Sequence, residues 1–378
     1  MNKGIKLTIL MLGALTMMSN VAIVTTLPYI KKYFNNVENI DFLSKLILTA
    51  PSLAIAFLAP FLGHIIHRIG SKKSTVIGLI MFSIFGSAGL YLNSIYSILI
   101  SRVLLGIAIA VLMITATTFI GEYFIGEERH KFMGLQSIFI ALGGVFFTVT
   151  GGILSDIKWR YSFGVYFIGL FVLYLIVKYI HKKDMLDFKE IKEIGNNINV
   201  NLIHVYFLAF LLMLVFYIIP TQIPFLLMHK FKANGSFTSM IIANAFFFNM
   251  LGAFSFAKLK KRFHFFKLYL LGFLVMAIGF IGIGMIKSIY FFFITSSLTG
   301  FGAGILIPTI RSWLLHNAHY TKQVKASGYL TSSLYLGQFA SPIVFHPFID
   351  IFGIQRFFFI IGMIINVIIF FFLYLEKN

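Results

Sequence analysis

Long apolar runs, separated by short polar stretches, set the pattern of this chain of 378 residues. Each run holds about 20 residues or more, and a helix that rises about 1.5 Å per residue needs that length to cross the hydrocarbon of a bilayer. We therefore predict an all-α membrane protein with twelve transmembrane helices. These spans lie near residues 6–30, 43–66, 74–92, 95–121, 133–154, 161–180, 203–228, 236–257, 266–286, 289–315, 327–346 and 355–374.

The longest hydrophilic stretch, residues 182–201, divides the spans into two sets of six. Its mixture of lysine and acidic residues is typical of a solvated linker. We predict an N-terminal six-helix bundle at 1–181, a cytoplasmic linker at 182–201 and a C-terminal six-helix bundle at 202–378. Several residue pairs recur at a fixed offset and at the same place in each half, which favours two parallel repeats. The pairs separated by 194 positions are Arg68 and Arg262, Gly106 and Gly300, Gly134 and Gly328, Gly143 and Gly337, and Asp156 and Asp350.

Composition supports a membrane protein and excludes several other classes. Hydrophobic residues make up 59% of the chain and charged residues 11%, whereas soluble domains carry about 25% charged residues. The net charge of +19 comes from basic residues in short loops, a pattern that reflects topology and not nucleic-acid binding. About 20 of the 31 lysines and arginines fall on the side of the two termini. We therefore expect both termini in the cytoplasm and the chain in a bacterial cytoplasmic (inner) membrane. The chain has no cysteine, and we expect no metal site and no cofactor.

The basic loop between the second and third spans, from Gly63 to Lys73, carries a motif. It resembles the loop between helices 2 and 3 of the major facilitator superfamily, whose pattern is Gly-x-Leu-Ala-Asp-Arg-x-Gly-Arg-Lys. Gly63, Arg68, Gly70 and Lys72 match this pattern, and His67 replaces the usual Asp. We expect Gly63 to let two helices approach closely and Gly70 to permit a tight turn.

Two further motifs resemble the same superfamily. In the fourth span, Arg102 and Gly106 resemble its second motif, and in the fifth span Gly143, Gly151 and Gly152 resemble the glycine-rich third motif of exporters. We expect the three glycines to form a close packing seam between the fifth and eighth spans. The motifs and their order resemble the drug-efflux-like (drug/proton antiporter) branch. This resemblance implies twelve helices in two pseudo-symmetric bundles, and a monomer that contacts a small-molecule solute and membrane lipid.

Glu122, at the end of the fourth span, is expected near the basic loop. In the family an acid at this position pairs with that loop and helps to hold the outward-facing state. The resemblance therefore implies a gating set. This set is Gly63, His67, Arg68, Gly70, Lys72 and Glu122. Because histidine titrates near neutrality, we hypothesise that pH acts on this gate through His67; the alternative is an exposed loop histidine with no role.

The family arrangement places the solute pathway along the first, fourth, seventh and tenth spans, with additions from the eighth and eleventh. It implies a polar cavity of Asn20, Thr25, Arg102, Tyr217, Gln222, Asn244, Asn249, Arg311 and Gln338. Arg102 either serves this cavity or only braces the first and fourth spans. All twelve acidic residues lie in loops or at span ends, so the embedded carboxylate that serves exporters of lipophilic cations is missing. We therefore expect an anionic, zwitterionic or neutral solute.

These observations predict a secondary active transporter that moves its solute by alternating access. Export of a metabolite or drug is favoured because the glycine motif belongs to exporters, and coupling to protons stays open. One alternative is an uptake permease for a small anionic or neutral metabolite. The other is a polytopic membrane enzyme, which needs a cluster of acids, histidines or metal ligands that the sequence does not supply. We therefore expect no enzymatic activity.

Overall fold

The computed structural model describes residues 3–124, 126–180, 202–318 and 323–377. Within these ranges the regular structure is entirely helical. The N-terminal half contains α1 (Lys3–Val21), η1 (Val24–Thr26), α2 (Leu27–Tyr33), α3 (Ile40–Ile69), α4 (Ser71–Ser87), η2 (Ala88–Leu90), α5 (Ile95–Tyr123), α6 (Gly126–Ile157), η3 (Trp159–Phe167) and α7 (Ile168–Tyr179). The C-terminal half contains α8 (Ile203–Phe216), α9 (Ile218–Lys230), α10 (Gly235–Lys260), α11 (Phe265–Met285), α12 (Phe291–Asn317), α13 (Gln323–Phe352) and α14 (Ile354–Lys377).

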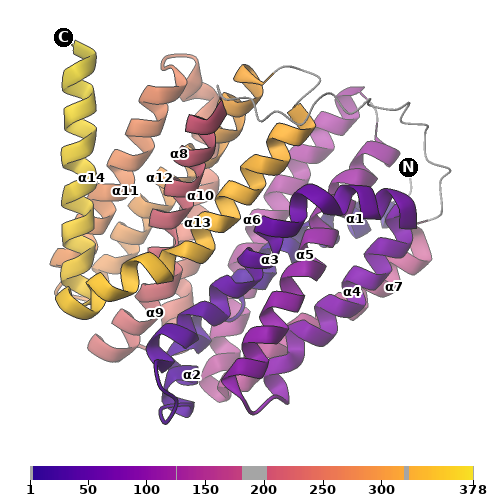
Figure 1. The fold of residues 1–378 in the computed structure, drawn as a ribbon, viewed down its shortest axis with the longest axis horizontal. Helices are drawn as coiled ribbons and strands as arrows, with labels where there is room; N and C mark the ends of the chain where they lie inside the picture. Colours follow the sequence, from indigo (N-terminus) through magenta and orange to yellow (C-terminus); the bar gives the residue numbers. More distant parts are fainter. Residues whose placement is uncertain (1–2, 125, 181–201, 319–322, 378) are drawn as a thin grey trace.

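The helices form two bundles, one from each half of the chain, with twelve spans in all (Figure 1). The bundles meet along two antiparallel pairs, α3 with α13 and α6 with α10. We call the end that carries the start of α1 and the end of α14 the terminal face, and the opposite end the distal face. At the distal face α2 and α9 lie side by side, and toward the chain ends the two bundles tilt apart (Figure 1).

Ten stretches of the described chain are long and apolar enough to cross a membrane. The first and eleventh predicted spans are outside this set. The first is divided among α1, η1 and α2, and the eleventh, α13, includes a run of hydroxyl side chains at Thr331, Ser332 and Ser333. Both still follow the path of a span, so the predicted all-α fold with twelve transmembrane helices in two bundles is confirmed.

The first and seventh spans are broken in the same part of each bundle. In the first, the β-branched run from Ile23 to Thr26 disfavours a continuous α-helix, and α2 begins with Pro28 in its first turn. In the seventh, α8 ends at Phe216, four residues before Pro220, whose ring would clash with the Phe216 carbonyl and which has no N–H to donate to it. Each bundle therefore begins with a segmented helix.

Most helices lie where the sequence predicts them, but some predicted spans consist of more than one helical segment. The sixth span begins with a 3-10 segment, η3, before α7. The predicted linker, residues 182–201, lies outside the described residues, and the predicted domain boundaries stay a prediction.

Candidate transport pathway and distal gate

Asp156 joins the two bundles at the distal face. Its carboxylate, near the end of α6, accepts bonds from the backbone N–H groups of Gly235 (2.5 Å) and Ser236 (2.8 Å) and from the Ser236 hydroxyl (2.5 Å) at the start of α10. The Tyr29 hydroxyl of α2 donates to the same carboxylate at 3.0 Å. An anion at a helix N-terminus is stabilised by the free N–H groups and the helix dipole. Asp156 therefore ties α2, α6 and α10 together.

A second distal connection runs between α3 and α13. Lys45 of α3, only 4% exposed, places its Nζ 3.5 Å from Nδ1 of His346. The Phe42 ring stacks on the His346 ring at 5.5 Å between centroids. Two turns deeper, the Ser52 hydroxyl donates to Gln338 Oε1 at 2.9 Å. These contacts fasten the second inter-bundle seam.

The same seam loosens toward the terminal face. Gly328 of α13 still lies near α3, where a Cβ added to it would stand 3.9 Å from Pro60 Cα. A Cβ added to Gly63, one turn further along α3, would meet no atom within 4 Å, and the same holds for Gly134 of α6. Gly63 thus does not support a close helix approach in this conformation, which corrects the prediction made for it. The inter-bundle contacts of Asp156, Lys45 and Ser52 lie nearer the distal face, and the Tyr335 hydroxyl of α13 donates to Met113 Sδ of α5 at 3.3 Å between the two faces.

Arg102 lies inside the N-terminal bundle. It is fully buried, and Nη2 donates to the carbonyls of Gly86 (2.5 Å) and Phe85 (3.3 Å) at the end of α4. Its guanidinium lies 4.8 Å from the centroid of the Phe163 ring and 5.1 Å from that of Tyr166, both in η3. In this conformation Arg102 therefore braces α4, α5 and η3, a different set of helices from the first and fourth spans proposed for a bracing role. Its predicted contact with solute stays a prediction.

The other predicted cavity residues do not converge on one point. Thr25 in η1 is buried and lies 3.5 Å from the Ser155 hydroxyl. Asn244 of α10 has two N–H donors on Nδ2, which lies 2.9 Å from each of three acceptors: the Phe293 carbonyl oxygen and the hydroxyl oxygens of Ser296 and Ser297. Asn244 therefore fastens α10 to α12.

The remaining members differ in their access to solvent. Gln338 accepts the bond from Ser52 in the α3–α13 seam, and Gln222 is 1% exposed. Tyr217 is buried at the break between α8 and α9. Asn249 is half-buried on α10 and Arg311 is exposed on α12. Asn20 lies in α1, and its side chain is outside the described part of the chain.

Several buried polar atoms of the helices that meet at the distal face have no hydrogen-bond partner among the described residues. They are Thr26 Oγ1, Thr49 Oγ1, Gln222 Oε1 and Ser341 Oγ. They come from η1, α3, α9 and α13, and thus from both bundles. An unpaired buried polar atom costs free energy, so a conformation or a solute that satisfies these atoms gains stability relative to this one.

The predicted gating residues lie at the terminal face. Gly70 has φ +94° and links α3 to α4, a conformation that favours glycine. The Ser71 hydroxyl, in the first turn of α4, donates to Glu122 at 2.8 Å. Lys72 donates to the Val177 carbonyl at 3.3 Å, and His67 and Arg68 are exposed. The predicted gating role of this set stays a prediction.

The glycines of α6 pack against two different partners. A Cβ on Gly151 would press into the backbone of Ala22, and one on Gly143 would stand 3.0 Å from the Ala14 Cβ, so these two glycines face the first span. A Cβ on Gly152 would meet Ser239 of α10. The expected seam between the fifth and eighth spans therefore contains Gly152, whereas Gly143 and Gly151 bring α6 close to the first span.

Sequence reasoning did not single out Asp156, Lys45 and His346 as residues that join the two bundles. Lys45 lies inside the predicted second span and His346 ends the predicted eleventh. An ionisable side chain inside an apolar span is expensive and tends to mark function, so this signal was present in the sequence. Only the fold, however, places the two residues side by side.

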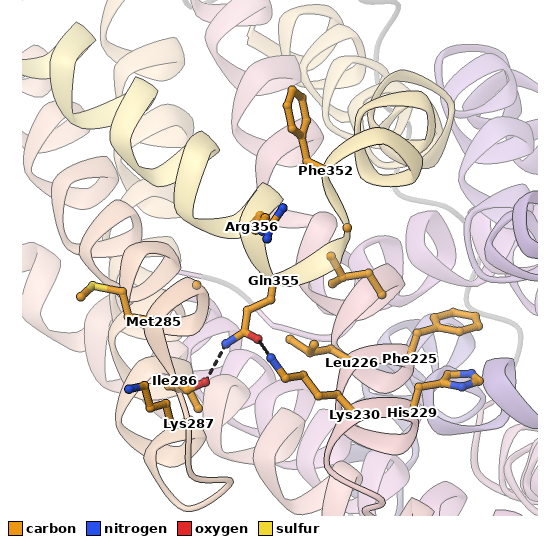
Figure 2. Close-up of a pocket in the computed structure, with 13 residues that line it drawn as sticks. Phe225, Leu226, His229, Lys230, Met285, Ile286, Lys287, Phe352, Gln355 and Arg356 are labelled. Atoms are coloured by element: carbon orange, nitrogen blue, oxygen red, sulfur yellow. Dashed lines mark hydrogen bonds between the residues drawn. The ribbon is translucent and has the colours of Figure 1, made fainter.

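A cavity of about 570 Å³ opens at the distal end of the C-terminal bundle (Figure 2). Its lining includes Lys230, Lys287 and Arg356 over an apolar wall. Gln355 accepts a hydrogen bond from Lys230 and donates one to the Ile286 carbonyl at 2.6 Å (Figure 2). These two bonds tie α9, the end of α11 and α14 together. The predicted cavity residues do not line this space, so it is separate from the pathway implied by the sequence.

The sequence profile of the Major Facilitator Superfamily matches residues 9–201 and 205–378. The chain belongs to the Major Facilitator Superfamily. This membership identifies the chain as a membrane transporter.

Among curated members of the superfamily, the Bacillibactin exporter of Bacillus subtilis (strain 168) is 23% identical over 348 residues, 87% of this chain and 85% of that protein. Multidrug resistance protein 2 of the same organism is 30% identical over 121 residues, 31% of this chain and 29% of that protein. The Arabinose-proton symporter of Escherichia coli (strain K12) is 27% identical over 136 residues, 36% of this chain and 27% of that protein. The last two matches thus span less than a third of the relative's length.

Solved structures of the superfamily share the fold over almost the whole chain. The nucleoside transporter NupG has a TM-score of 0.78 at 13% identity and covers 100% of both chains. The xylose transporter of Escherichia coli in its inward open conformation has a TM-score of 0.74 at 16% identity, over 97% of this chain and 95% of that one. At these identities the likeness concerns the fold alone.

Proposed function

We propose that this transporter exports an anionic or neutral small molecule by alternating access. The observation that carries the proposal is the uneven seam between the bundles. Hydrogen bonds and a buried lysine join them near the distal face, whereas Gly63 and Gly134 face open space toward the terminal face. Such contacts are individually weak, so they can break and reform in a cycle that exposes the interior to each face in turn.

The distribution of basic residues supports the orientation. Lysines and arginines are concentrated at the terminal face, and short basic loops stay in the cytoplasm. With this orientation the distal gate faces the outside, and the conformation described here admits solute from the cytoplasm.

The charges along the helices support the choice of solute. Every acid in the described helices lies within a few residues of a helix end, for example Asp41, Glu122, Asp156 and Asp350. Arg311, by contrast, is exposed within the length of α12. An anion or a neutral molecule can occupy such a pathway, whereas a cation lacks a counter-ion there.

The direction of transport rests on similarity over the length of the chain. Of the three curated relatives named above, the one matched over the largest share of this chain, 87%, bears the name of an exporter. The symporter match covers about a third of the chain. Export is therefore favoured over uptake.

Transport in membrane vesicles of known orientation tests this proposal. Everted vesicles present the cytoplasmic face to the medium, so an exporter concentrates a fluorescent anion such as carboxyfluorescein inside them, and vesicles without the protein do not. Accumulation of small anionic and neutral metabolites only in right-side-out vesicles would establish an uptake permease instead. Accumulation of a cationic dye such as ethidium, with no anion transported, would contradict the charge argument.

A further inference from the structure

The His346 imidazole is shared between the two bundles at the distal gate. Its Nδ1 lies 3.5 Å from Lys45 Nζ of α3, across the seam. The same Nδ1 lies 3.4 Å from Asp350 Oδ1, one turn along its own helix α13. One nitrogen atom therefore faces a cation on the opposite bundle and an anion on its own.

A proton on Nδ1 decides which of these two partners the histidine can bind. Neutral Nδ1 accepts a hydrogen bond from Lys45, which links α3 to α13, and the proton of the imidazole is then on Nε2. Protonated Nδ1 donates to Asp350 instead and brings a second positive charge next to Lys45. The repulsion acts across the seam, where Lys45 is only 4% exposed and screening by water is weak.

Lys45 is packed against the C-terminal bundle at a second point. Its Nζ lies 5.5 Å from the centroid of the Phe225 ring on α9. Asp41, on the same helix, forms an ion pair with Lys31 of α2 at 2.5 Å. The charged groups that act on His346 are Lys45, Asp350, Asp41 and Lys31.

Water at the distal face reaches His346 through a surface pocket. This pocket of about 480 Å³ is lined by Glu38, Asn39, Phe42, Tyr96 and His346, among others. His346 is one of the lining residues, whereas Lys45 is not. A proton from the distal solution can therefore reach Nδ1 without crossing the protein.

We propose that Lys45 and His346 form a proton-operated latch: unprotonated His346 holds the distal gate closed, and protonation from the distal side releases it. The proposal rests on the proposed function, since it names the groups through which protons act on that transporter. A proton enters from the distal pocket, binds Nδ1, and leaves by the same route or after the gate has moved. The latch would let proton binding favour the distal-open state without an embedded carboxylate.

Spin-label distances in the purified full-length protein test the latch without any solute. Because the chain has no cysteine, Asn36→Cys and Lys287→Cys place one label on each bundle at the distal face, on residues outside the latch. Histidine changes charge between about pH 5 and 8, so distances are measured near those two limits. We expect the ratio of long to short distances to rise about tenfold at the acid limit, a change that needs only about 1.4 kcal/mol.

The variants separate a latch from a structural histidine. His346→Gln keeps an acceptor but cannot become a cation, so its gate should stay closed at both limits. Lys45→Met removes the charge that His346 repels and should likewise abolish the response to pH. His316→Gln, on the terminal face, is the matched control and should keep the wild-type response. Size-exclusion profiles establish that each variant is folded.

Two results would overturn the latch: equal distance distributions at both limits in the parent protein, or a full response to pH in His346→Gln. Either result leaves the proposed function standing if vesicles still accumulate the anion. Conversely, a normal distance response with no transport in either vesicle orientation would reject the proposed function and keep the latch.

Discussion

Gly106 and Gly300 occupy equivalent positions in the two bundles, 194 residues apart. A Cβ on Gly106 of α5 would press into the Pro51 carbonyl oxygen of α3, and a Cβ on Gly300 of α12 would press into the Ala245 carbonyl oxygen of α10. Pro51 and Ala245 are themselves 194 positions apart. The same backbone-on-backbone contact therefore occurs in both halves, and the repeat suggested by the glycine offset has a physical basis.

Valine at either of these glycines should destabilise the protein. Because the carbonyl that a side chain would meet belongs to the backbone of a packed helix, relief requires the helices to separate. We expect Gly106→Val and Gly300→Val each to lose about 1–3 kcal/mol of stability, seen as a lower midpoint of thermal unfolding in detergent. Gly63→Ala, where the added carbon meets open space, is the control and should unfold like the parent. An unchanged midpoint in both valine variants would mean that the close contacts are absent.

Asp156→Asn should open the distal gate. The amide cannot accept the same set of bonds from Gly235, Ser236 and Tyr29, and it loses the charge that the α10 N-terminus stabilises. A hydrogen bond to a charged group contributes about 1.5–3 kcal/mol, so the ratio of closed to open molecules should fall at least about tenfold. We would measure labelling of the buried Thr26→Cys by a water-soluble maleimide, which should become faster in Asp156→Asn. Glu128→Gln, exposed at the terminal face, should leave the labelling rate unchanged.

Arg102 should tolerate neither alanine nor lysine. Alanine removes the bonds to the Phe85 and Gly86 carbonyls and the packing on two aromatic rings. We expect a loss of about 1.5–3 kcal/mol, the usual contribution of hydrogen bonds made by a charged group. Lysine keeps the charge but not the planar donor fork that stacks on rings, so it should rescue little. The midpoint of thermal unfolding checks this, with the exposed Arg356→Lys as the comparison, and full rescue by lysine would show that charge alone matters.

Gln222→Met should leave the protein folded and impair transport. The Oε1 atom of Gln222 is buried with no partner among the described residues, so this conformation gains nothing from it and an apolar side chain of similar size costs little. If Oε1 binds solute or a neighbour in another step of the cycle, accumulation in everted vesicles should fall about fivefold or more, which corresponds to about 1 kcal/mol. Ile223→Leu, a replacement at the neighbouring buried apolar residue, tests whether a general disturbance of α9 suffices. Undiminished transport in Gln222→Met would remove Gln222 from the pathway.

The sequence predicted the membrane fold because its information is local. An apolar run of sufficient length becomes a helix in lipid almost regardless of its neighbours, and the predicted second span at 43–66 accordingly lies within α3 (Ile40–Ile69). The break in the seventh span follows from Pro220, and the break in the first span follows from the β-branched run before Pro28. Hydropathy averaged over a whole span does not reveal such a break, because a single interrupted position hardly changes the average.

The candidate site could be predicted only in part, because it depends on which helix faces touch. Arg102 was correctly expected to avoid lipid, since burying a charge requires partners, but its partners on α4 and η3 follow only from the packing. The glycines of α6 show the same limit: Gly151 and Gly152 are adjacent in sequence, yet they face Ala22 of the first span and Ser239 of α10 respectively. Lys45 and His346 are 301 positions apart, and each half of the chain alone gives no indication of the other.

The segmented helices determine how little of the molecule must move during a transport cycle. Because the first and seventh spans are already interrupted, the short distal helices α2 and α9, of 7 and 13 residues, can move while α1 and α8 keep their packing. The movement is then small and takes place close to one membrane surface. A molecule that binds between α2 and α9 from the distal side would stop the cycle without entering the interior, so the distal surface is the most direct point at which to block the protein.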